Sequence, residues 1–137
     1  MPSPLILAGF ALLIVGTVCS RVVAERALKL LSATEKVTLL DSFSRLRMFG
    51  GLPLLFVFLC FGGVAYLPPR LMWSAYLAVW LLVAVYFVVF DRVVTRRLRG
   101  LGINLDYQRA QAKSRWLFYS GFFAFFVLAT LNCFSPR

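Results

Sequence analysis

Long apolar runs and short charged segments alternate along the chain. Four runs contain no Asp, Glu, Lys or Arg: Met1–Ser20, Met48–Pro69, Leu71–Phe90 and Trp116–Pro136. Each is close to the ~20 residues with which a helix, rising ~1.5 Å per residue, crosses ~30 Å of hydrocarbon. Because the runs are continuously apolar, they predict helices and not the alternating strands of a membrane barrel. We expect four transmembrane helices, over residues 4–22, 48–67, 71–90 and 116–134.

The first run has a second interpretation, as a secretory signal peptide. It has no basic segment before its apolar residues and no small-residue cleavage site of the A-x-A kind. We therefore expect it to be the first transmembrane helix.

The basic residues set the expected orientation of these helices. Six Lys and Arg lie in segment 20–47 and seven in segment 91–115, which makes thirteen of the fifteen in the chain. Only Arg70 and Arg137 lie on the other side of the predicted helices. Connectors rich in Lys and Arg stay on the cytoplasmic side of a membrane. Both basic segments are therefore predicted to be cytoplasmic, with both ends of the chain outside.

Cap signals in the basic segments predict that the helices continue beyond the membrane. Ser32 and Glu35 have the spacing of a capping box, which starts a helix. Gly100 or Gly102 can end the third helix, because glycine tolerates the left-handed conformation of a C-cap. Asn104 can then cap the next helix.

Together these elements predict an all-α integral membrane protein with a single membrane domain over residues 1–137. Its four transmembrane helices are expected to form two long antiparallel hairpins that extend into the cytoplasm, N-out and C-out. The tips of the hairpins are expected near residues 31–34 and 100–104.

Two similar segments suggest an internal duplication. The heptapeptide SRVVAER at 20–26 resembles DRVVTRR at 91–97, which would divide the chain into tandem halves 1–67 and 71–137. Repeats entering from the same side would be related by an axis along the membrane normal. The alternative is that two helices leaving a membrane for the cytoplasm are alike without a common origin.

Composition supports the membrane interpretation and argues against nucleic-acid binding. The chain is 61% hydrophobic with a mean hydropathy of +0.85, whereas soluble domains are about 45–50% apolar. Its net charge of +10 and pI near 10.4 would otherwise favour nucleic acid. The charges, however, flank the apolar runs, as membrane topology requires. No nucleic-acid partner is expected.

The chain offers little equipment for catalysis or metal binding. It has no histidine, and Cys19, Cys60 and Cys133 lack the spacing of a metal site. All five acidic residues lie outside the apolar runs, so no ionisable group is expected at the membrane centre. We predict a non-catalytic protein without metal or cofactor.

Small residues mark the expected helix contacts. Gly9 and Gly16 are seven apart and so lie on nearly one face, which lets another helix approach closely. We expect the first and second helices to form the closest pair, with a kink at Pro53. The candidate packing residues are Gly9, Gly16, Gly50, Gly51, Pro53, Gly62 and Gly63.

Basic residues beside the apolar runs are the candidate contacts for lipids or partners. Guanidinium groups bind phosphate through paired hydrogen bonds, and anionic headgroups attract basic residues near the membrane. The alternative is that these charges only set topology. The candidates are Arg45, Arg47, Arg92, Arg96, Arg97, Arg99, Lys113 and Arg115.

These features favour a non-catalytic membrane subunit or scaffold of a larger inner-membrane complex. It would dock other membrane subunits or anionic headgroups through its basic hairpins. The alternatives are a small homo-oligomeric channel, a lipid-handling transporter or an insertase-like helper. Arginine outnumbers lysine twelve to three, which is typical of GC-rich bacterial genomes and favours a bacterial inner membrane. An organelle membrane is the other location considered.

The expected orientation can be tested by labelling single cysteines. In a background without the three native cysteines, Ala33→Cys and Asn104→Cys should react with an impermeant maleimide only after the cytoplasmic face is opened. Arg70→Cys is the matched control and should react in intact cells or vesicles of native orientation. Labelling of residues 33 and 104 from outside would overturn the orientation.

Overall fold

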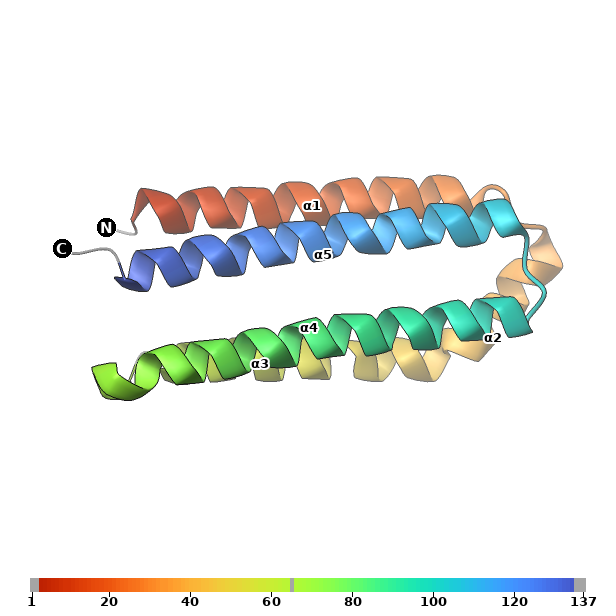
Figure 1. Ribbon diagram of the computed structural model, residues 1–137. Helices are drawn as coiled ribbons and strands as arrows, with labels where there is room; N and C mark the ends of the chain where they lie inside the picture. Colours follow the sequence, from red (N-terminus) through yellow and green to blue (C-terminus); the bar gives the residue numbers. More distant parts are fainter. Residues whose placement is uncertain (1–2, 65, 135–137) are drawn as a thin grey trace. The chain divides into compact units, whose positions relative to one another are not determined.

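The computed structural model describes residues 3–64 and 66–134, with the side chains of all but 46–50 in these ranges. Its regular structure there consists of helices alone (Figure 1): α1 (Pro4–Leu28), α2 (Ala33–Gly50), α3 (Leu52–Val64), α4 (Pro69–Gly100) and α5 (Leu105–Phe134). Three of these, α1, α4 and α5, are long and apolar enough to cross a bilayer. The protein is therefore all-α, with at least three helices suited to a membrane.

Local sequence signals account for the helix ends. The hydroxyl of Ser3 accepts a hydrogen bond from the backbone N–H of Ile6 (3.3 Å), and Pro4 occupies the first turn of α1. The side chain of Asn104 accepts from the N–H of Asp106 (2.9 Å) and caps α5. Gly102 has φ +63° between α4 and α5, a conformation that glycine adopts at little cost. The predicted caps at Asn104 and Gly102 are confirmed.

The segment 48–67 is not one uninterrupted helix. α2 ends at Gly50 and α3 begins at Leu52, so Gly51 separates them. Glycine is unfavourable within a helix, and Pro53 is tolerated only because it lies in the first turn of α3. The kink expected at Pro53 is instead a break two residues earlier. α3, with 13 residues, covers only about 20 Å at the helical rise.

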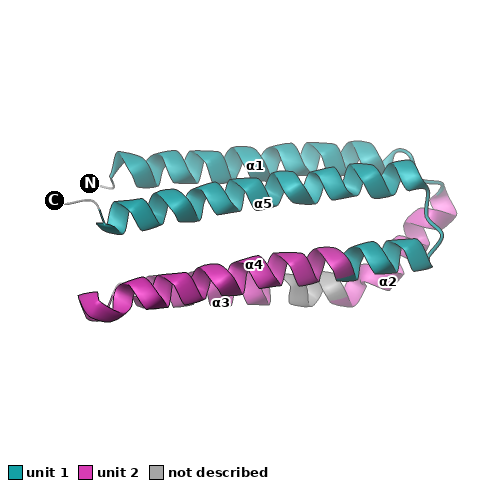
Figure 2. Cartoon of the chain, viewed as in Figure 1, with its two compact units in different colours: residues 1–32, 93–137 teal, residues 33–92 magenta. Residues whose placement is uncertain are grey.

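The described chain forms two compact units (Figure 2). Unit 1 comprises residues 1–32 and 93–137, and unit 2 comprises residues 33–92. The internal duplication suggested by the sequence stays a prediction, and these units group the chain differently from its tandem halves 1–67 and 71–137. The reason is that the first and last helices pack together, which places both ends of the described chain in unit 1.

In unit 1, α1 and α5 lie antiparallel along their length (Figure 1). The Phe10 and Phe125 rings are 4.8 Å apart, and Ser20 meets Ser114 further along the pair. Between them the two backbones touch. A Cβ added to Gly16 would lie 2.9 Å from the Cα of Gly121.

The face carrying Gly9 and Gly16 thus packs on α5, whereas the sequence suggested the 48–67 segment as its partner. A Cβ at Gly9 would lie 3.2 Å from the Phe125 ring, and one at Gly121 would lie 3.0 Å from the carbonyl oxygen of Leu12. Small residues allow such contact, which supplies van der Waals energy that lipid cannot. The sequence did not indicate α5 as the partner of α1, because Gly121 lies in a segment rich in aromatic residues.

In unit 2, α3 and α4 are joined by an aromatic contact. The rings of Phe61 and Tyr76 are 5.1 Å apart, and Tyr76 is almost fully buried. Val57 and Val64 are buried on α3. The buried residues of α4 recur every three or four positions along one face: Tyr76, Val79, Val83 and Phe87, followed by Val94 and Leu98 in unit 1.

Large apolar side chains also cover the exposed faces of the long helices. Ile14 and Val18 on α1 and Leu77 and Leu81 on α4 are more than half exposed. A water-soluble protein rarely exposes apolar area on this scale, whereas a bilayer solvates it. The distribution of apolar side chains therefore supports the membrane class.

The Gly16–Gly121 contact predicts that replacing Gly16 by alanine destabilises the protein, whereas the same replacement at an uncrowded glycine does not. Gly16→Ala should lower the free energy of unfolding by about 1–3 kcal/mol, because the new methyl group meets backbone atoms that cannot turn aside. Gly63→Ala is the matched control, since its Cβ would meet no described atom within 4 Å. We expect the control to be neutral or slightly stabilising. Equal midpoints for the two variants, in SDS titrations followed by tryptophan fluorescence, would contradict this packing.

Candidate functional site

A polar layer joins α1 and α5 where their apolar runs end. The hydroxyl oxygens of Ser20 and Ser114 lie 2.9 Å apart, and the Ser114 hydroxyl also lies 2.8 Å from the carbonyl oxygen of Ser20, to which it can donate. Ser114 is buried. Buried hydroxyl groups need such partners because their desolvation is otherwise costly.

Arg115 extends this layer to α4. Its side chain is only 8% exposed, and its Nη2 donates to the hydroxyl oxygen of Thr95 at 3.0 Å. A buried guanidinium is costly unless it is hydrogen-bonded, so this contact links the end of α4 to the start of the apolar part of α5. The sequence grouped Arg115 with the lipid or partner contacts. Its burial gives it a structural position instead, which charge counting alone cannot detect.

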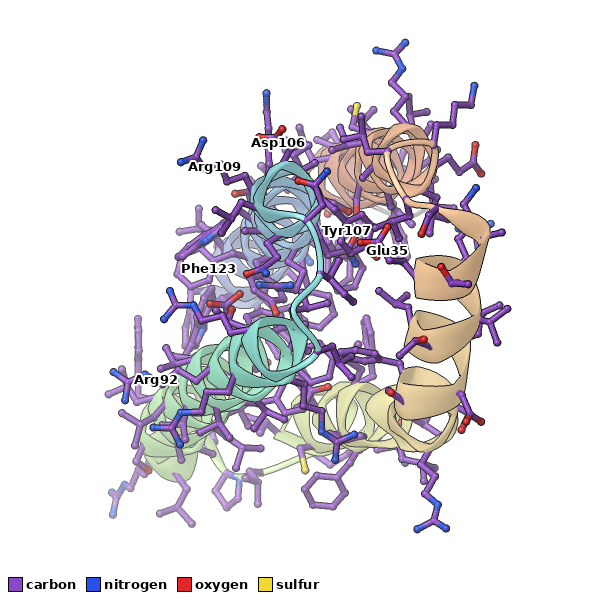
Figure 3. The ribbon with its side chains drawn as sticks, turned by 90° about the vertical axis from the view of Figure 1, so that its right-hand side faces the viewer. Glu35, Arg92, Asp106, Tyr107, Arg109 and Phe123 are labelled. Atoms are coloured by element: carbon purple, nitrogen blue, oxygen red, sulfur yellow. The ribbon has the colours of Figure 1, made fainter. Side chains whose placement is uncertain are left out.

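The other basic candidates lie at the surface. The side chain of Arg47 lies outside the described residues, and the remaining ones are exposed: Arg45, Arg92, Arg96, Arg97, Arg99 and Lys113. Within α4, Arg92, Arg96 and Arg99 follow at intervals of four and three residues, so they share one helix face. Figure 3 shows Arg92 projecting outward from α4, and Arg109 outward from α5.

The glycine candidates separate into two groups. Gly9 and Gly16 are in close helix contact, as described above. A Cβ at Gly51, Gly62 or Gly63 would meet no described atom within 4 Å. Gly50 is the last residue of α2, and its surroundings lie outside the described residues.

The aromatic residues of α5 serve mainly as packing. Tyr119, Phe122, Phe125 and Phe126 are buried, whereas Phe123 is half exposed. The ring centroids of Phe122 and Phe126 are 4.7 Å apart. These rings fill the space beside the glycine contact, and Trp116 and Phe123 remain exposed.

The described residues bring together no group of three or more His, Cys, Asp or Glu side chains that could hold a metal ion. Among the described residues, Cys19, Cys60 and Cys133 take part in no disulfide. The Ser120 hydroxyl donates to the carbonyl of Trp116 (2.8 Å), and the Thr130 hydroxyl to that of Phe126 (2.7 Å). These hydroxyl groups therefore donate within their own helix.

No protein-family model, curated protein sequence or solved structure matches this chain. The candidate site therefore depends on the geometry of its own residues: a buried polar layer and an exposed basic face of α4. Sequence analysis missed Ser20, Thr95, Ser114 and Gly121. A usable signal for the first three is that each polar residue lies within five residues of the end of an apolar run.

The Arg115–Thr95 contact can be tested by a double-mutant cycle. Arg115→Gln and Thr95→Val should each lower the free energy of unfolding, by about 1–3 kcal/mol, because each removes a hydrogen bond to a charged group. The double variant should lose less free energy of unfolding than the two single variants lose together. Arg99→Gln, at an exposed position, should change stability by less than about 0.5 kcal/mol. Additive single effects in thermal unfolding followed by circular dichroism would argue against the contact.

Proposed function

We propose that this chain is a non-catalytic integral membrane subunit, or scaffold, of a larger membrane assembly. The observation that carries the proposal is the distribution of its mass. Three helices are suited to a bilayer and expose apolar side chains, so of the described residues little beyond α2 and the helix ends would lie outside the membrane. A chain built in this way can hold other subunits or lipids in position.

Helix direction supports four crossings with both ends on the same side. α4 and α5 follow each other, so if both cross the membrane they cross in opposite directions. α1 is antiparallel to α5, so α1 and α4 cross in the same direction. The intervening chain must then return across the membrane, and α3 is its apolar helix. Together with the basic connectors, this supports the N-out and C-out topology.

The exposed basic residues then lie at the cytoplasmic surface. In that position they suit acidic partners or anionic headgroups, and they lie in the two segments that the positive-inside rule assigns to the cytoplasm. The high arginine content favours a bacterial inner membrane as the location.

The short α3 favours the lipid-handling alternative more than the channel. A helix that covers about 20 Å is shorter than the ~30 Å hydrocarbon layer and perturbs the lipids around it. For a channel, the path would be lined by Ser74, Tyr86, Ser120 and Asn132, but the hydroxyl groups of Ser74 and Ser120 donate to carbonyls of their own helices.

The scaffold proposal is tested by purifying the tagged full chain from its native membrane in mild detergent. We expect at least one other membrane protein to co-purify in a fixed ratio, and to dissociate more readily at high salt if basic side chains hold it. A tagged α-helical membrane protein from the same cells controls for unspecific recovery. Recovery of the chain as a lone monomer or homo-oligomer would overturn the scaffold proposal, and a homo-oligomer would favour the alternatives.

A further inference from the structure

One exposed strip of α4 combines an apolar part with a basic part. α4 is a single helix that runs through both compact units, so helix geometry places its residues along one axis. Positions separated alternately by three and four residues share a face. The strip consists of Leu81, Val85, Val88, Arg92, Arg96 and Arg99, all exposed.

The buried face of α4 lies opposite this strip. Val94 and Leu98 are 6% and 2% exposed. At ~100° per residue, Val94 is about half a turn from Arg92 and from Arg96, and Leu98 is about half a turn from Arg96 and about a quarter turn from Arg99. The strip contains no acidic residue. Its basic part is therefore directed outward from α4, as Arg92 shows in Figure 3.

The dimensions of the strip match one leaflet of a bilayer. From Leu81 to Arg92 the axis rises about 16 Å, close to half of the ~30 Å hydrocarbon layer. Arg96 and Arg99 follow within about 11 Å, which is the region of the headgroups and the adjacent water. An acidic cytoplasmic protein would not account for the apolar part of the same face.

Helix direction distinguishes these arginines from the basic residues of α2 and α5. The Cα–Cβ bond tilts toward the N-terminus of a helix, and in the proposed topology α4 leaves the membrane at its C-terminal end. The side chains of Arg92, Arg96 and Arg99 therefore lean back toward the headgroups. α2 and α5 lead into the membrane, so Arg45, Arg109 and Lys113 lean toward the cytosol.

We infer that this strip of α4 binds an anionic phospholipid of the cytoplasmic leaflet. The lipid phosphate is bound by the guanidinium groups, which can offer two parallel hydrogen bonds each. The acyl chains lie along Val88, Val85 and Leu81. The inference rests on the proposed topology and names the lipid class and the helix that the proposed function leaves open.

The test uses the full chain in phosphatidylcholine vesicles and compares two spin-labelled lipids by electron paramagnetic resonance. Wild-type protein should immobilise phosphatidylglycerol about fivefold more readily than phosphatidylcholine, the factor expected from one such contact. The R92Q/R96Q/R99Q variant should reduce this preference to near one. The R45Q/R109Q/K113Q variant removes the same number of exposed charges and should retain most of it.

A lysine variant distinguishes the effect of charge from that of the paired hydrogen bonds. It also serves as a milder substitution in case the glutamine variant misfolds. R92K/R96K/R99K keeps the charge but loses the paired hydrogen bonds, so an intermediate preference supports the site. Equal losses in the two glutamine variants would overturn it, because a diffuse field would then explain the attraction. Absence of any preference in wild-type protein would also overturn it. With cysteine labelling unchanged, those results leave the topology and the scaffold proposal standing.

Discussion

Helices in hydrocarbon gain little from turning apolar side chains toward one another, because lipid solvates those side chains equally well. Association must come from close backbone contact and from hydrogen bonds. Here the contact of Gly16 with Gly121 brings α1 and α5 together, and the pair Ser20–Ser114 adds hydrogen bonds near one end of it. The antiparallel direction of α1 and α5 within unit 1 is fixed by these contacts.

Local signals in the sequence predicted the helical class and several helix ends. Asn104 and Gly102 act within one or two residues of their own positions, so short-range rules were sufficient for them. The partner of α1 was not predictable in the same way. In a segment that is apolar on every side, periodicity cannot distinguish the face toward lipid from the face toward a helix. The position of Gly16 indicated which face of α1 packs against another helix, but not which helix that is.

The sequence identified the basic residues of the candidate site, but it did not predict which of their side chains are exposed and which are buried. Counting identified Arg92, Arg96 and Arg99 as basic residues beside an apolar run, and they are exposed. The same count could not separate them from Arg115, which is one residue from Trp116 and is buried against Thr95. Whether a basic side chain at such a boundary turns inward or outward depends on which helix lies beside it, and that is tertiary information.

The pairing of α1 with α5 also has a consequence for biosynthesis. Ser20 and Ser114 are separated by 94 positions, which a ribosome covers in about 5–20 s at ~5–20 residues per second. If α1 enters the membrane as it is made, its glycine face is there before its neighbour in unit 1 has been synthesised. Lipid or an assisting protein would then cover that face until α5 is made and displaces it.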